Sequence, residues 1–333
     1  MTSIREVARL AKVSPATVSR VMNGTANVNP EKKERVLRAI AETGFVPNEV
    51  ARSLFRKSAK TIGLILPGIE NPFFTQLASA IEKEADTNGY RVFFCNTENN
   101  FEKEKMALQM LKSMNADGII LTRSEERLQP YVEEMNIPVV VTDTLPAGKK
   151  TNAYVDCDHY QGGRLAAEHL IECGCEKIVC MKGVQTLSSA KARYEGYRDV
   201  CREHDLKERT VDCDYSFHRG LAATEELLEK YPDTDGIIAS NDMVALSVFK
   251  VLHKKQIVVP DQIQIVGFDD IYLSSLLSPE LTTITQPIEE IGRKAVELLV
   301  QHNNRDMIGM KYVFPVSLTA RGTTRWQEKK NPT

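Results

Sequence analysis

The chain has 333 residues, enough for two or three domains, and its 42% hydrophobic and 26% charged residues are ordinary for a globular protein. The N-terminus lacks the apolar stretch of a secretory signal, and no run of about eighteen apolar residues could span a membrane. The seven cysteines are scattered without a CxxC pair, which predicts reduced thiols in a cytoplasmic protein that holds no metal or cofactor.

Charge is distributed unevenly, although the net charge is only −2. Residues 1–60 contain 12 Lys and Arg against 5 Asp and Glu, a net charge of +7. The rest of the chain contains 31 against 40, a net charge of −9. This asymmetry predicts an anionic partner for the N-terminal sixty residues and none for the remainder.

Three short helices are predicted at the N-terminus. A capping box of Ser3 and Glu6 begins the first, and Ser14 caps the second only a few residues after the first ends. This spacing is that of a helix-turn-helix. A third helix is predicted from the Asn29 cap to Thr43. Together they can enclose a core of Ile4, Val7, Val18, Val21, Val36 and Ile40.

The second helix suits the major groove of DNA. Its apolar residues lie at i, i+3 and i+4 on one face, which leaves small and polar residues for the other. Small side chains allow close approach, arginine can make two hydrogen bonds to guanine, and alanine can touch a thymine methyl. The residues expected to contact DNA are Ser14, Ala16, Thr17, Arg20 and Asn23. The alternative is an ordinary amphipathic surface helix.

Four short motifs then follow in order: Thr17-Val18-Ser19-Arg20, Asn23-Gly24, Gly44-Phe45-Val46-Pro47-Asn48 and Ala51-Arg52-Ser53-Leu54. Their order and spacing resemble the LacI family of bacterial transcriptional repressors. The resemblance implies a hinge helix over residues 48–55 that folds only when two subunits pair on operator DNA, with Leu54 wedged into the minor groove. A stretch of about eight residues is too short to be a stable helix alone.

The hinge residues that the resemblance assigns to DNA are Asn48, Arg52, Leu54 and Lys57. The alternative for this segment is an interdomain linker whose Leu54 packs on the core.

From Thr61 onward, strands alternate with helices. Apolar runs typical of strands occur at Thr61–Leu66, Arg91–Cys95, Gly118–Leu121, Pro138–Thr142, Ala153–Val155, Lys177–Met181, Gly236–Ala239 and Ile263–Phe268. Helices are predicted between them, among others at Phe73–Asn88, Glu102–Met114, Gln161–Cys173, Ala190–Glu203, Gly220–Lys230 and Asp242–His253. The pattern predicts an α/β fold with two parallel sheets, and no GxGxxG or Walker motif supports nucleotide chemistry.

This region is similar to periplasmic sugar-binding proteins and to the cores of LacI-family repressors. The resemblance implies two α/β lobes, linked by three crossing strands, that close over a ligand. It predicts a helix-turn-helix domain at 1–46, a hinge and linker at 47–60 and a two-lobed dimerisation core at 61–325. The N-lobe is expected at about 61–156 and 287–317, and the C-lobe at about 157–286 and 318–325.

Matching the motifs of ribose-binding family members assigns a set of aromatic and polar residues to the effector. These are Phe73, Phe74, Asp143, Arg193, Phe217, Asn241, Asp269 and Gln286. Polar side chains at the carboxyl ends of parallel strands face the ligand crevice, and they can hydrogen-bond sugar hydroxyls while rings cover the C–H faces. The alternatives are core packing for both Phe73 and Phe74, a helix cap for Asn241 and a turn for Asp269.

The resemblance favours ribose or a related pentose as the effector, with one departure. Ribose binders follow the matched Asp143 with arginine, whereas this chain has Thr144, so a cation that could donate to two sugar hydroxyls at once is lost. A purine effector and activation by a phosphorylated carrier protein are the alternatives within the family.

The prediction is therefore a homodimeric repressor that leaves a palindromic operator when it binds a small sugar. A sugar-binding transport protein is a different class, and the basic N-terminal helices count against it. A sugar enzyme is a third class, but no nucleophile, base or metal cluster is organised around the paired carboxylates at 269–270 and 289–290. His159 and His169 are predicted as helix residues, not ligands.

Overall fold

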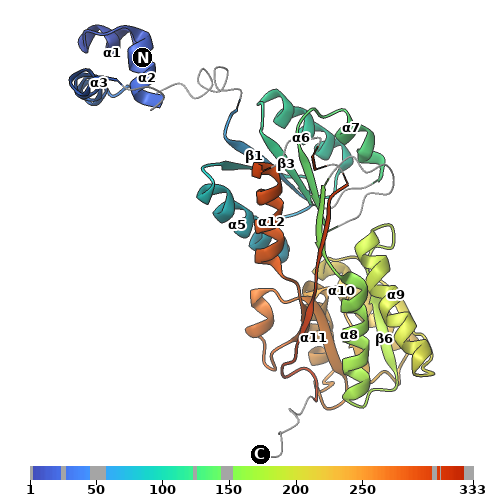
Figure 1. The fold of residues 1–333 in the computed structure, drawn as a ribbon. Coiled ribbons are helices and arrows are strands. Elements are labelled where there is room, and N and C mark those ends of the chain that lie inside the picture. The colour runs from blue at the N-terminus through green and yellow to red at the C-terminus, as the bar shows by residue number, and fades with distance from the viewer. Residues whose placement is uncertain are drawn as a thin grey trace, which may run out of the picture. The chain divides into compact units, whose positions relative to one another are not determined.

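The computed structural model describes residues 3–23, 28–45, 58–122, 126–143, 153–301, 306–307 and 309–325 (Figure 1). The chain divides into two compact units, Met1–Ala59 and Lys60–Thr333. Within the described ranges, no helix combines the length and apolar character needed to cross a membrane.

The first unit contains α1 (Ile4–Leu10), α2 (Pro15–Asn23) and α3 (Pro30–Thr43). The caps are those that the residue types favour, because Ser3 accepts from the Glu6 N–H and Asn29 from the Glu31 N–H. Three valines, one from each helix, are fully buried at the centre: Val7, Val18 and Val36. The other three predicted core residues, Ile4, Val21 and Ile40, pack against this cluster, so the predicted three-helix core is confirmed.

The N-lobe of the second unit is a six-stranded parallel sheet with the order β11-β5-β4-β3-β1-β2. Its strands are β1 (Thr61–Leu66), β2 (Arg91–Asn96), β3 (Gly118–Thr122), β4 (Val139–Thr142), β5 (Ala153–Cys157) and β11 (Lys311–Phe314). One face packs against α5 (Pro72–Thr87) and α12 (Ile288–Gln301). The other packs against α6 (Phe101–Ser113), η1 (Glu126–Leu128) and α7 (Gln129–Glu133).

The C-lobe repeats this architecture with the strand order β12-β10-β9-β8-β6-β7. Its strands are β6 (Ile178–Lys182), β7 (Thr210–Asp212), β8 (Gly236–Ile238), β9 (Gln264–Asp269), β10 (Thr282–Thr285) and β12 (Ser317–Thr319), of which β12 runs antiparallel to β10. One face is covered by α10 (Phe217–Lys230) and α11 (Asp242–Lys254), the other by α8 (His159–Glu172) and α9 (Ser188–Glu203). A short helix, η2 (Tyr272–Ser275), follows β9.

The described chain passes between the lobes at three places: from β5 into α8, from β10 into α12, and from β11 into β12 (Figure 1). The lobes also touch directly, because the Tyr272 N–H of the C-lobe donates to Gln76 Oε1 of α5 at 3.3 Å. A rearrangement between the lobes therefore has to bend these three crossings.

The predicted fold class is confirmed. The eight predicted strands correspond to β1–β6, β8 and β9 within two residues. Four strands were not predicted: β7 and β12 have only three residues, and β10 is Thr-Thr-Ile-Thr without an apolar run. The edge strand β11 buries none of its residues fully. Such segments become strands because a neighbouring strand pairs with them, which no local pattern shows.

Candidate DNA-reading and effector sites

Helix α2 presents the face that the sequence predicts for DNA. The Ser14 hydroxyl accepts from the Thr17 N–H at 3.2 Å and lies 3.0 Å from the Thr17 hydroxyl, so it caps the helix. Val18 is buried, whereas Ala16 and Arg20 are exposed. The apolar side of α2 therefore packs within the unit, and the face that is predicted to contact DNA is left open to solvent.

The other predicted DNA contacts cannot be placed in the same way. Asn23 is the last residue of α2, and only its backbone is described. The hinge residues lie outside the described ranges: Asn48, Arg52, Leu54 and Lys57.

A small cavity between the lobes brings together seven of the eight predicted effector residues. Its lining consists of Asn71, Phe73, Phe74, Asp143, Arg193, Tyr215, Asn241, Asp269 and Gln286. The N-lobe contributes the start of α5 and the end of β4, the C-lobe contributes α9 and the ends of β8 and β9, and Gln286 lies on the β10–α12 crossing. The free volume is about 10 Å³, room for about one water molecule, so a sugar can enter only if the lobes separate.

The N-lobe wall is aromatic with one carboxylate. Asn71 caps α5 by accepting from the Phe73 N–H at 3.0 Å, which directs Phe73 and Phe74 to the cavity. Their rings lie edge to face with centroids 5.2 Å apart, and both also belong to the N-lobe core. Asp143 follows β4 directly in a left-handed conformation with φ 65°, and it is buried.

The C-lobe wall is built around Arg193 and Asp269. The Arg193 guanidinium lies 3.5 Å over the Phe268 ring, and its Nη1 donates to the Ser240 carbonyl at 2.9 Å. Its Nη2 is 3.8 Å from Asp269 Oδ1, which also accepts from Gln286 Nε2 at 2.7 Å. These contacts place a guanidinium, a carboxyl group and an amide side by side in the cavity.

Asp269 combines an unusual backbone conformation with a buried carboxyl group whose pKa is raised. Its φ of 118° is rare for a residue with a side chain, and it is 4% exposed. Burial raises the pKa of the Asp269 carboxyl, Arg193 opposes that shift, and Asp242 adds to it. A strained, buried carboxyl in a cleft is a typical feature of a functional site.

Asn241 has two roles. Its side chain caps α11 by accepting from the Val244 N–H at 2.9 Å, which is the alternative role that the sequence predicted for it. Its Nδ2 also donates to the Tyr215 carbonyl at 3.3 Å. It nevertheless lines the cavity. The cap therefore orients the amide that faces the cavity.

The assignment of Phe217 to the cavity is not supported, because Phe217 does not belong to its lining. Helix α10 begins three residues before the predicted start, at Phe217, with Ser216 as its cap. The Phe217 ring lies against His218 and Lys250 instead. The aromatic residue that precedes the helix and reaches the cavity is Tyr215, which follows the unpredicted strand β7.

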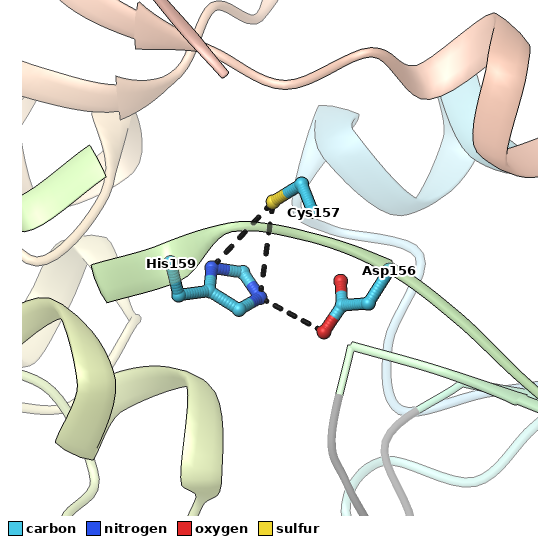
Figure 2. Close-up of side chains that lie close together, drawn as sticks. All are labelled: Asp156, Cys157 and His159. Carbon is cyan, nitrogen blue, oxygen red and sulfur yellow. Dashed lines mark hydrogen bonds and ion pairs between the residues drawn. The ribbon is translucent and has the colours of Figure 1, made fainter. Parts of the chain in front are cut away.

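Next to this cavity lies a second buried cluster that the sequence did not reveal: Asp156, Cys157 and His159 (Figure 2). His159 Nε2 is 3.1 Å from Asp156 Oδ2, and Cys157 Sγ is 3.7 and 3.9 Å from the two ring nitrogens. The cluster joins the cavity, because Cys157 Sγ donates to Gln286 Oε1 at 3.0 Å and Arg193 Nε donates to His159 Nδ1 at 3.2 Å. His159 is a helix residue as predicted, since it begins α8.

A helix-turn-helix unit and a two-lobed α/β core with a polar cavity between its lobes define a ligand-responsive DNA-binding protein. Residues 3–48 match the family model of bacterial regulatory proteins of the lacI family. Residues 59–312 match that of periplasmic binding proteins and the sugar binding domain of the LacI family. The chain belongs to the LacI family, and it is a regulator, not an enzyme.

Individual relatives agree with this assignment. The chain is 42% identical over 329 residues to the ribose operon repressor of Halalkalibacterium halodurans, and the alignment covers 98% of each chain. It is 34% identical over 307 residues to the transcriptional repressor PurR of Aliivibrio salmonicida, and this alignment covers 90% of this chain and 92% of that one.

Solved structures show the same fold. The lac repressor dimer bound to operator and the anti-inducer ONPF matches with a TM-score of 0.88 at 28% identity, over 97% of this chain and 98% of that one. A periplasmic binding protein/LacI transcriptional regulator from Alkaliphilus metalliredigens complexed with D-xylulofuranose matches with a TM-score of 0.72 at 36% identity, over 80% of this chain and 99% of that one.

Proposed function

We propose that this chain is a cytoplasmic, homodimeric repressor of a sugar utilisation operon, released from a palindromic operator by ribose or a related pentose. The observation that carries the proposal is the convergence of polar side chains from both lobes and a crossing on one cavity beside two phenylalanine rings. Asp143 and Asp269 can accept from sugar hydroxyls, and Arg193 can donate to them. The rings can cover the apolar faces of the sugar.

The repressor is released from its operator because the sugar binds the closed arrangement of the lobes better than the open one. A sugar that touches both lobes stabilises the closed arrangement, and it shifts the equilibrium only by as much as it prefers that arrangement. Closing the lobes bends the three crossings and moves the N-lobe against its counterpart in the dimer. In the family picture this separates the hinge helices, and the DNA contacts proposed for residues 48–57 are then lost.

An exposed apolar edge of the N-lobe supports the dimer. Strand β2 ends the sheet, and its Phe93 and Phe94 are 38% and 49% exposed. Helix α6, which follows β2, exposes Met106 and Met110, and Met114 directly after the helix is exposed as well. An apolar edge strand attracts another chain, and we assign it to a second copy of this protein.

A purine is the competing effector. Tyr215 in the cavity favours it, because a second aromatic ring opposite the phenylalanines can stack on a flat base. The carboxylates and amides favour a polyhydroxy ligand instead. Calorimetry with ribose, xylulose, hexoses and purines, followed by operator titration with each ligand that binds, tests the proposal. If a purine gives binding heat and lowers operator affinity, whereas none of the sugars does, the effector is a purine and not a sugar.

Arg20→Ala should weaken operator binding by roughly 1–3 kcal/mol and relax the preference at one base position per half-site. The exposed position of Arg20 on α2 motivates this expectation. Electrophoretic mobility shifts on single-base operator variants measure it. An equal loss on every variant would mean that Arg20 contacts only phosphate.

Sugar affinity should decrease as the pH falls through the pKa of Asp269. Burial raises that pKa, so the carboxyl of the free protein is protonated at pH values where ordinary carboxyls are ionised. Sugar hydroxyls donate to the ionised form, so binding below this pKa releases a proton, and affinity rises with pH until the free carboxyl is already ionised.

Calorimetry in buffers of different ionisation enthalpy measures the released proton directly. Asp269→Asn is the control, since it cannot release this proton. Affinity that is independent of pH, without proton release, would show that Asp269 is already ionised or makes no contact with the sugar.

A further inference from the structure

We propose that His159 is a positioning residue for the effector response, because it holds the Arg193 guanidinium in the cavity and links it to the crossings between the lobes. This inference rests on the proposed function, in which Arg193 contacts the sugar. His159 itself is buried, 5% exposed, and it does not line the cavity. Its effect on the sugar can therefore act only through its neighbours.

The guanidinium of Arg193 is held from two directions. Nε donates to His159 Nδ1 at 3.2 Å, and Nη1 donates to the Ser240 carbonyl at 2.9 Å. Because the guanidinium is a rigid plane, fixing two of its nitrogens fixes the third. Nη2 is thereby placed 3.8 Å from Asp269 Oδ1, among the groups that line the cavity.

The hydrogen-bond partners determine the tautomer of His159. Arginine nitrogens only donate, so Nδ1 must carry a lone pair and the ring proton must lie on Nε2. That proton is donated to Asp156 Oδ2 at 3.1 Å. Asp156 also accepts from the Tyr154 hydroxyl of β5. Both ring nitrogens are thus engaged, and His159 has one defined orientation.

The same tautomer argues against a metal ion in the cluster of Figure 2. Asp156, Cys157 and His159 are of metal-binding types, and their ligand atoms lie within 4.8 Å of one another. Coordination by Nε2 would move the ring proton to Nδ1, where it would face the Arg193 N–H. Burial also raises the pKa of the Cys157 thiol well above its usual range, which disfavours the thiolate that a metal needs.

The cluster connects the cavity with two of the three crossings. His159 begins α8 directly after the β5 crossing, and Cys157 Sγ donates to Gln286 on the β10–α12 crossing at 3.0 Å. Gln286 in turn donates to Asp269. A sugar that moves Arg193 and Asp269 closer together therefore displaces both crossings through these hydrogen bonds. The crossings are the segments that must bend when the lobes close.

Two substitutions separate the two hydrogen bonds of His159. In His159→Asn, the amide oxygen can lie near the position of Nδ1 and accept from Arg193, but the side chain is too short for Asp156. In His159→Gln, the amide can reach the position of Nε2 and keep the bond to Asp156, while Arg193 loses its acceptor. A purely structural role of His159 would make the two variants behave alike.

With D-ribose as the probe, calorimetry should show a Kd about tenfold higher for His159→Gln and close to the parent value for His159→Asn. Thermal unfolding and operator affinity without sugar should be similar in both variants. In an Arg193→Lys background, which lacks Nε, the difference between the two variants should disappear. Equal ribose affinity of the two variants in the native Arg193 background would overturn the positioning role.

Two results distinguish this inference from the proposed function. Unchanged ribose binding by Arg193→Lys would remove Arg193 from the effector site and contradict the proposed function itself. Independently of any ligand, long-range ¹H–¹⁵N NMR of histidine-labelled protein reports the tautomer, with the His159 signals identified by their loss in His159→Gln. The proton should lie on Nε2, and a proton on Nδ1 would overturn the proposed link.

Discussion

Asp269→Ala and Arg193→Ala should each give a repressor that binds its operator normally but no longer responds to sugar. Both residues lie in the C-lobe wall, opposite the phenylalanines of the N-lobe. Losing a partner costs a buried polar group about 1–3 kcal/mol, and more when it is charged. Two conformations of one protein typically differ by only a few kcal/mol, so this loss is enough to remove the shift that the sugar is proposed to cause. DNA reading resides in the separate N-terminal unit and should be preserved.

Fluorescence anisotropy of labelled operator, titrated with and without ribose, measures both properties in one experiment. Two matched substitutions serve as controls. Asp212→Ala removes a carboxylate that also ends a C-lobe strand but is 82% exposed, and Arg202→Ala removes a 69% exposed arginine from the same helix as Arg193. Both controls should keep the sugar response. Normal release of the Asp269 and Arg193 variants by sugar would refute the proposed effector site.

Phe94→Lys should dissociate the dimer and weaken operator binding by about 100-fold or more. Phe94 is half exposed on the edge strand β2, so a lysine there leaves the monomer intact. Two charges facing each other across an isologous interface repel and oppose its desolvation. Each half-site is then bound alone, and the gain from linking two reading units, typically 10²–10⁴-fold, is lost.

Size-exclusion chromatography with light scattering measures the assembly, and calorimetry with ribose shows whether the monomer keeps its cavity. The matched control is Val313→Lys, at a residue that is 45% exposed on β11, the edge strand at the opposite side of the same sheet. That variant should remain a dimer. A dimer that survives Phe94→Lys but not Val313→Lys would place the interface on the other edge.

The capped helices, the long strands and most residues of the cavity can be predicted from residue types and their spacing. The capped helices of the first unit follow from Ser3, Ser14 and Asn29, because these side chains satisfy free N–H groups next to their own position. Long apolar strands such as β1 and β9 stand out for a similar reason, since a strand buried on both faces needs apolar residues throughout. Seven of the eight residues that the motifs assign to the effector line one cavity, and they could be picked out because they lie in recognisable motifs at strand or helix ends.

Other features arise only when distant segments meet. Tyr215 reaches the cavity, and Phe217 does not, because a three-residue strand and a helix cap at Ser216 decide where α10 begins. Short strands of this kind are stabilised by their neighbours and have no local pattern. The link from Asp156 through His159 to Arg193 joins residues up to 37 positions apart through hydrogen bonds of 3.1 and 3.2 Å. Local sequence determines the helices with their caps and the long apolar strands, whereas the short strands, the tautomer of His159 and the raised pKa of Asp269 depend on partners that only the packed lobes supply.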